Sequence, residues 1–291
     1  HRQRIALNNK SYKHSITLQT HRDGRQKMDK LKHFQKDNNK ETSTDYLKAA
    51  MIIIMWVLVW QIADLIINNS IILVGPADIV STLLKCVARK DFWRICFASF
   101  ARIAVGFLLS FAAGFLLAAA AYRYHIIEEI FNPLISLLKT VPMISFVIML
   151  LIWVGNQALT IYLSFLVVLP IIYTSTLSGF KNADKSRLEM AKSFNFSRWK
   201  KFIYIYRPAF MPFLISSCRV ALGMCWKSGV MAEVIATPKP SIGREMYVAQ
   251  QYLQTGNLFA WTVVVIILST VFEKIFTKIL ELFNKSGGNL L

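Results

Sequence analysis

Six apolar runs constrain this chain most, because each is long enough to cross a lipid bilayer as a helix. A hydrocarbon core about 30 Å thick requires roughly 20 apolar residues per helix. The runs cover residues 46–67, 95–122, 130–154, 159–177, 208–226 and 258–276. Hydrophobic residues make up 55% of the sequence and charged residues only 17%, which excludes an ordinary soluble domain. The sequence therefore predicts an all-α, polytopic membrane protein with about six transmembrane helices.

The formal net charge of +18 is distributed as expected for a membrane protein, and we expect no nucleic-acid partner. Eleven Lys and Arg residues precede Lys48 and eight lie within 178–207, whereas the turn 155–157 contains none. The positive-inside rule places both basic regions, and with six spans the C-terminus, in the cytoplasm of a cell whose plasma membrane holds the protein. Four cations fall on the opposite side and are exceptions to the rule: Lys85, Arg89, Lys90 and Arg94.

Three segments follow from this pattern. Residues 1–45 form a basic, polar N-terminal arm without an apolar core, so we predict no cleavable signal peptide. Residues 1–27 precede the first methionine, Met28, and we interpret them as a non-native extension; a nucleic-acid- or lipid-binding tail is the alternative. Residues 46–283 form the transmembrane domain, and 284–291 a C-terminal tail.

The loop between the fourth and fifth spans, residues 184–207, contains a predicted short helix. Ser186 and Glu189 fit a capping box, in which each side chain bonds a backbone N–H at the helix start. Asn195 is predicted to end the helix, since Asn tolerates the left-handed conformation of a C-terminal cap.

Three apolar residues of this helix, Leu188, Ala191 and Phe194, recur at helical spacing on a cationic background. We expect them to form one exposed stripe, because so short a helix cannot bury itself. The helix must then lie on the membrane surface or dock into another protein. The alternative is a solvated loop with a chance helical pattern.

Two spans carry features that affect packing. The second contains many small residues, including Gly114 and the run 118–121, which allow close helix approach and predict a central position. The third contains Pro133 and Pro142, which predict a kinked helix whose freed carbonyls face protein or a wet cavity.

Charged residues within or beside the spans are candidates for a translocation path, because intramembrane charges are costly and often functional. They are Arg102, Lys139, Arg219, Lys227 and Glu233. The alternative interpretation is that each cation extends to an interface or pairs with Glu233 or Asp64.

No pattern indicates catalysis or a bound cofactor. The sequence has no G-x-x-x-x-G-K-[ST] phosphate loop, and its five histidines show no metal-ligand spacing. The four cysteines show no C-x-x-C pairing, and we interpret them as small core residues. We therefore predict a protein that is not an enzyme and binds neither metal nor cofactor.

An ordered set of motifs over residues 70–257 resembles the permease subunit of bacterial ATP-binding-cassette (ABC) importers, most closely the nitrate/sulfonate/taurine branch. The family's cytoplasmic signature, E-A-A, then three intervening residues, then Gly, is matched by Glu189-Met190-Ala191 and Asn195, with Arg207-Pro208 further on. Met190 and Asn195 depart from the usual Ala and Gly. The other matching elements are Val74-Gly75-Pro76, Ser99 to Arg102 with Gly106-Phe107, Lys139 to Pro142, Arg219 to Gly223, Trp226-Lys227 and Ala232-Glu233.

The resemblance implies a coupling helix seated in a groove of a separate cytoplasmic ATPase, which would hydrolyse the ATP. The coupling residues would be Ser186, Leu188, Glu189, Met190, Ala191, Phe194 and Asn195. It also implies two permease copies (a homodimer or a paired permease), an ATPase dimer and an extracellular or lipid-anchored substrate-binding protein, all at a lipid membrane.

The sequence leaves alternatives open for the transported solute and for the transport mechanism. The surplus of cations near the spans favours import of a small anionic or zwitterionic solute of the sulfonate, nitrate or taurine type. An importer of a neutral vitamin precursor and a self-contained secondary transporter or channel are the alternatives. The short helix in 184–207 favours the ABC importer, because a self-powered transporter does not need it.

Overall fold

The computed structural model describes residue 48 and residues 50–286, and every regular element within them is helical. The predicted N-terminal arm (1–45) and the end of the predicted tail (287–291) lie outside the described residues. Contacts divide the chain into two units, 1–66 and 67–291. The helix Ala50–Ile67, which matches the first predicted span, lies in the first unit except for its last residue.

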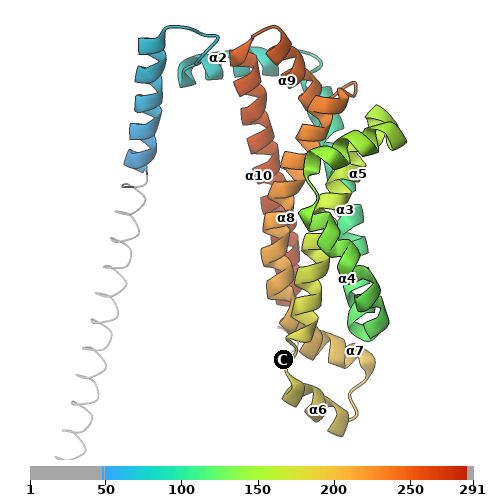
Figure 1. Cartoon of the computed structure of the whole chain (residues 1–291). Helices are drawn as coiled ribbons and strands as arrows, with labels where there is room; N and C mark the ends of the chain where they lie inside the picture. The colour runs from blue at the N-terminus through green and yellow to red at the C-terminus, as the bar shows by residue number, and fades with distance from the viewer. Residues whose placement is uncertain (1–47, 49, 287–291) are drawn as a thin grey trace, which may run out of the picture. The chain divides into compact units, whose positions relative to one another are not determined.

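Within residues 67–286, the second unit contains ten helical elements, whose arrangement is shown in Figure 1. They are α2 (Pro76–Val87), α3 (Phe92–Arg123), α4 (His125–Thr140), α5 (Met143–Lys181), α6 (Lys185–Ser193), α7 (Arg198–Lys201), the π-helix η1 (Phe202–Tyr206), α8 (Arg207–Ala236), α9 (Ile242–Gln251) and α10 (Thr255–Ser286). Helix α10 runs three residues past the predicted domain boundary at 283.

Five helices in the described part of the chain are long and apolar enough to cross a membrane, one fewer than predicted. The difference arises in the predicted third span, 130–154, which is split between α4 and the start of α5. Val141 and Pro142 are extended there, because proline has no N–H to donate and disfavours helical geometry in the residue before it. A second break divides α5 at Gly155, whose φ of 72° suits glycine, and this confirms the predicted turn at 155–157.

The centre of the unit is a layer in which α3 lies along α5 and α5 lies along α8. Glycines allow this close approach: a Cβ on Gly106 would lie 2.7 Å from the Ile161 carbonyl oxygen, and one on Gly179 would lie 2.7 Å from the Phe210 Cα. Gly114 of α3 also packs against α5, at Ile172. The predicted central position of the second span is therefore confirmed. Such packing matters in lipid, where apolar burial alone does not drive helices together.

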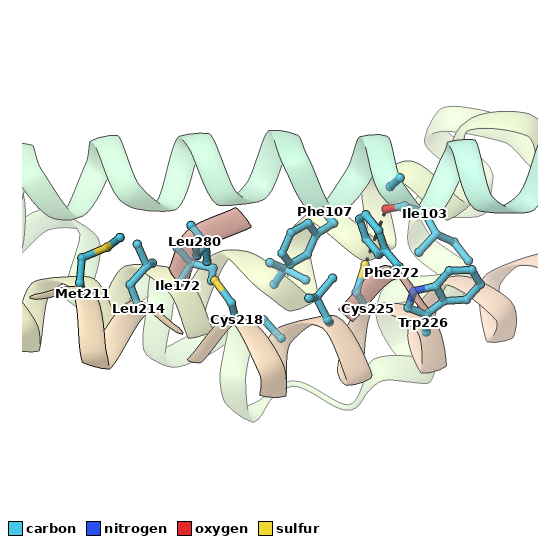
Figure 2. Packing of buried hydrophobic residues seen from close by; sticks show 14 of the residues in the cluster. Ile103, Phe107, Ile172, Met211, Leu214, Cys218, Cys225, Trp226, Phe272 and Leu280 are labelled. Atoms are coloured by element: carbon cyan, nitrogen blue, oxygen red, sulfur yellow. Dashed lines mark hydrogen bonds between the residues drawn. The ribbon is translucent and has the colours of Figure 1, made fainter. Parts of the chain in front are cut away.

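The main core joins α3, α5, α8 and α10 (Figure 2). In this core, Ile103 and Phe107 of α3 pack in one cluster with Cys218 and Trp226 of α8 and with Phe272 of α10. All four cysteines are buried, as the sequence predicted, and Cys218 and Cys225 belong to this core.

The second unit has two distinct ends (Figure 1). Helices α6 and α7 lie at one end, beside the start of α8, and α9 and α2 lie at the other, where α8 finishes. At 1.5 Å per residue, the 30 residues of α8 separate these ends by roughly 45 Å, enough to span a bilayer.

Candidate functional site

The first candidate site is the α6–α7 end, which contains the predicted short helix. Helix α6 begins after Asp184, whose side chain accepts a hydrogen bond from the Ser186 N–H at 2.9 Å. The predicted capping box of Ser186 and Glu189 was therefore wrong: Ser186 is already inside the helix, and both side chains are exposed. Asp184 competes successfully for the cap because its carboxylate suits the positive helix N-terminus.

The predicted end of α6 is confirmed in detail. Asn195 has a φ of 50°, the left-handed conformation. The Phe196 N–H donates to the Ala191 carbonyl at 2.9 Å, and the Asn195 N–H donates to the Lys192 carbonyl at 3.1 Å. These two bonds form a Schellman motif, and Phe196 packs beside Ala191 as that motif favours. Helix α6 thus ends in a fixed geometry.

The apolar residues of α6 do not form a single exposed stripe. Ala191 is fully buried with Ala183 and Ile205, and Leu188 is half-buried at the same contact. Phe194 is the C-terminal cap, past the last helical turn, and is 72% exposed. The predicted stripe was therefore wrong, because two of its members anchor α6 to the protein's own core.

Three large apolar side chains of this loop are exposed: Met190, Phe194 and Trp199. They stand among exposed cations, namely Lys192, Arg198 and Lys200. Trp199 lies on α7. The Ser197 side chain caps the start of this helix, because its hydroxyl accepts a hydrogen bond from the Lys200 N–H. Sequence periodicity along α6 missed Trp199, since it belongs to a separate helix. These exposed apolar side chains can contact a partner, while the buried side of α6 is attached to the rest of the protein through Ala191.

The second candidate site is a buried ion pair at the opposite end. Arg102 of α3 donates from Nη1 to Glu233 Oε1 of α8 at 2.6 Å, and Glu233 is fully buried. Arg102 also donates from Nη2 to the Pro240 carbonyl. The structure thus brings together two of the five predicted path residues, in the pairing that the alternative interpretation expected.

Further hydrogen bonds complete this network. The Ser99 hydroxyl donates to Glu233 Oε2 at 2.7 Å and accepts from the Ile242 N–H at 2.8 Å. The Gly243 N–H donates to the same carboxylate oxygen at 3.2 Å. A Cβ on Gly243 would lie 2.4 Å from that of Glu233, so only glycine fits this position. The i, i+3 spacing of Ser99 and Arg102 on α3 could have indicated a shared partner, but the partner itself comes from distant sequence.

The other three predicted path residues lie elsewhere. Arg219 donates to Glu281 of α10 at 3.1 Å, and both side chains are more than half exposed. Lys227 is exposed four residues beyond Gly223 on the same face of α8, and it has no ion-pair partner among the described residues. The five residues therefore do not form one site.

Lys139 lines a largely apolar cavity of about 210 Å³ where α4 ends. Residues of α5 and α8 complete the lining, including Met143, Leu163, Val167, Pro170 and Met224. Met224 lies three residues before Lys227 on α8, so these two side chains are neighbours on the helix surface and the cavity lies beside Lys227. Lys139 also has no ion-pair partner in the described part of the chain.

Comparison with known proteins identifies similar membrane transport components. Residues 110–285 match the family described as "Binding-protein-dependent transport system inner membrane component". The chain is 25% identical over 230 residues to the taurine transport system permease protein TauC of Escherichia coli, covering 77% of this chain and 82% of that protein. It is 30% identical over 221 residues to the putative aliphatic sulfonates transport permease protein SsuC of E. coli, covering 75% and 82%. The corresponding Bacillus subtilis SsuC is 24% identical over 238 residues, covering 81% and 86%.

Proposed function

This chain belongs to the family of binding-protein-dependent inner membrane transport components, the permease subunits of ABC importers, and from that premise we propose that it forms the translocation path for a small anionic or zwitterionic solute. The relatives named for taurine and aliphatic sulfonates support this solute class. An external binding protein would deliver the solute, and a separate ATPase dimer would supply energy.

The α6–α7 end supports the ATPase partnership, and it is the observation that carries the proposal. Met190, Phe194 and Trp199 are exposed there, whereas Ala191 anchors the same helix. Aromatic side chains that fill a partner's pocket contribute most of the energy at protein interfaces. In this assignment the docking contacts come from Met190, Phe194 and Trp199, while Leu188, Ala191 and Asn195 fix the shape of the helix.

The exposed face of α8 is the proposed wall of the path. Arg219, Gly223 and Lys227 follow one another at intervals of four residues, and nothing lies within 4 Å of a Cβ built on Gly223. Lys139 lines the cavity that reaches α8 at Met224, a neighbour of Lys227 on the helix surface. Cations within a membrane need water, partners or a counter-ion, and they lower the barrier for a passing anion. A second permease copy would close the path from the opposite side.

The buried pair Arg102–Glu233 supports a different role. Both charges are satisfied by protein groups, so they hold the end of α3, α8 and α9 together rather than face a solute. We therefore propose that Lys227 and Lys139 face the solute together with Arg219, whose pair with Glu281 is more than half exposed, and that Arg102 and Glu233 position the wall.

The proposed orientation places the α6–α7 end, the N-terminus and the C-terminus in the cytoplasm of a cell with the protein in its plasma membrane, with α4 and the start of α5 (143–154) counted together as a sixth crossing. The basic residues of 178–207 support this orientation through the positive-inside rule. The α2–α9 end would then face the binding protein outside.

Uptake by the reconstituted complex tests the proposal. The permease is assembled in proteoliposomes with its ATPase and binding protein, and uptake of radiolabelled taurine is measured with ATP or a non-hydrolysable analogue inside. We expect ATP-dependent uptake that methanesulfonate competes for. Uptake without ATP would indicate a self-contained transporter, and uptake of a neutral heterocycle without competition from sulfonates would reject the anionic solute.

A further inference from the structure

A second, strongly basic pocket lies at the α2–α9 end, away from the proposed path residues on α8. Its volume is about 370 Å³, within the range of small-molecule sites. It is formed by the turn between α2 and α3, the first turn of α3, and the loop and first turn of α9. Four cations and two carboxylates contribute to its lining: Arg89, Arg94, Lys239, Arg244, Asp91 and Glu245, together with Ile95 and Pro240.

The charges in this pocket are not balanced. Glu245 is shared by two arginines, Arg89 at 3.3 Å and Arg244 at 3.9 Å. Arg94 and Lys239 are exposed and have no ion-pair partner among the described residues. Asp91 makes no ion pair there either, so it offsets only part of the positive charge. The N-termini of α3 and α9 add their partial positive charges at the same place.

The position of these cations needs a separate explanation. They lie at the end opposite the basic α6–α7 loop, where the positive-inside rule predicts few cations. Arg89 and Arg94 were exceptions to that rule in the sequence, and the structure gathers both into one cavity with Lys239. Their grouping is what a binding site for negative charge requires.

We propose that this pocket binds an oxoanion group, a sulfonate, sulfate or carboxylate, through Arg94 and Lys239. Arginine and lysine are the usual donors to such groups. The sidedness of the pocket rests on the proposed function. The group could belong to a free solute arriving at the external face or to an acidic side chain of the binding protein, and the chemistry is the same.

The pocket is connected to the buried network. Its wall residue Pro240 accepts a hydrogen bond from Arg102, and Lys239 is the residue immediately before it. Lys239 and Pro240 belong to the loop that Arg102 and Glu233 attach to α3 and α8. An anion bound to Lys239 therefore acts directly on this loop. Occupancy of the pocket would be sensed at the outer ends of both helices.

The test uses the purified permease–ATPase complex in nanodiscs, with the double variant R94Q/K239Q. The matched control is K85Q, which removes an exposed cation of α2 outside the pocket. The first arm measures binding of methanesulfonate and of sulfate by calorimetry at low salt, without binding protein. The second arm measures the affinity of the cognate binding protein, which is first identified by its stimulation of the complex's ATPase activity.

Each outcome has a distinct meaning. If the free anion binds and R94Q/K239Q weakens it tenfold or more, the pocket is a solute site. If only the binding protein loses tenfold or more in affinity, the oxoanion is a protein carboxylate. If neither affinity changes relative to K85Q, the proposal is overturned. Stimulation of the wild-type ATPase by the binding protein is measured independently, so the proposed function can stand when the pocket proposal fails.

Discussion

The pairing of Arg102 with Glu233 shows how a charged residue is accommodated inside this bundle. The Glu233 carboxylate accepts from Arg102, from the Ser99 hydroxyl and from the Gly243 N–H. Removing charges from water is costly, and the cost is recovered only when the geometry is good and other hydrogen bonds complete the shell. The carboxylate meets both conditions, so the pair fixes the geometry of this end of the bundle.

Replacing Glu233 with Gln is expected to destabilise the protein by about 3–5 kcal/mol, because it leaves the Arg102 guanidinium without a buried counter-charge. Thermal unfolding of the purified variant in detergent measures this effect. The matched control is Arg219→Gln, which breaks the exposed pair with Glu281 and should cost about 0–1 kcal/mol. Equal losses in the two variants would contradict a structural role for the buried pair.

Sequence reasoning at the level of residues succeeded where the cause was local. Asn195 was predicted as the left-handed end of α6 because that preference belongs to the residue itself. The cap was assigned to Ser186 rather than Asp184 because both residues are capable of capping, and the register of the helix decides between them. Arg102 and Glu233 are 131 positions apart, so only the packing of α3 against α8 could establish their pairing.

Among the elements, α6 supports a direct test of coupling. Phe194→Ala removes an exposed aromatic side chain, so the permease should fold normally while its affinity for the ATPase falls about tenfold or more. Co-purification and ATPase stimulation measure the loss. Ser193→Ala, at an exposed neighbouring position, is the control and should leave both unchanged.

The neighbouring buried position should behave differently. Ala191→Arg places a charge where Ala191 contacts Ile205, so it should detach α6 and increase proteolysis of the loop. A well-folded Ala191→Arg variant that loses only ATPase binding would show that Ala191 faces the partner, contrary to the structure.

The contact between α3 and α5 makes a separate prediction. A Cβ on Gly106 would lie 2.7 Å from a backbone oxygen and from the Ser164 Cβ, so Gly106→Ala should lower stability by about 1–3 kcal/mol. Gly223→Ala is the control, because its Cβ meets no atom within 4 Å and alanine favours the helix. Thermal midpoints that fall in both variants alike would contradict this packing.

Element boundaries were predictable where hydropathy defines them and less so where backbone geometry does. The apolar runs gave the positions of α3, α8 and α10, although α8 extends ten residues beyond the predicted end at 226. Its last turns carry Lys227 and Glu233, which lower the local hydropathy but remain helical because Glu233 is satisfied internally. The predicted third span was too continuous, since a hydropathy profile does not record the extended backbone that Pro142 imposes.

For the whole molecule, membrane insertion, helical architecture and family could all be predicted from the sequence. Apolar run length is a strong signal, because a bilayer admits only elements with internally satisfied backbones. The ordered motifs between 70 and 257 gave the family, which the match at 110–285 now shows. The basic pocket of Arg94 and Lys239 could not be predicted, because its lining comes from two loops that only the fold brings together.

The orientation of the two ends provides the last prediction. If the α6–α7 end is cytoplasmic, a cysteine at the exposed position Arg198 should react with a membrane-impermeant maleimide only after the cells are permeabilised. A cysteine at Gln250, exposed on α9, should react in intact cells. The native thiols should give little background because all four are buried, and burial raises the pKa of the Cys86 thiol and so keeps it protonated. The wild-type chain measures that background. Labelling of Arg198→Cys in intact cells would reverse the orientation, and with it the assignment of the α6–α7 end to the ATPase and of the basic pocket to the external face.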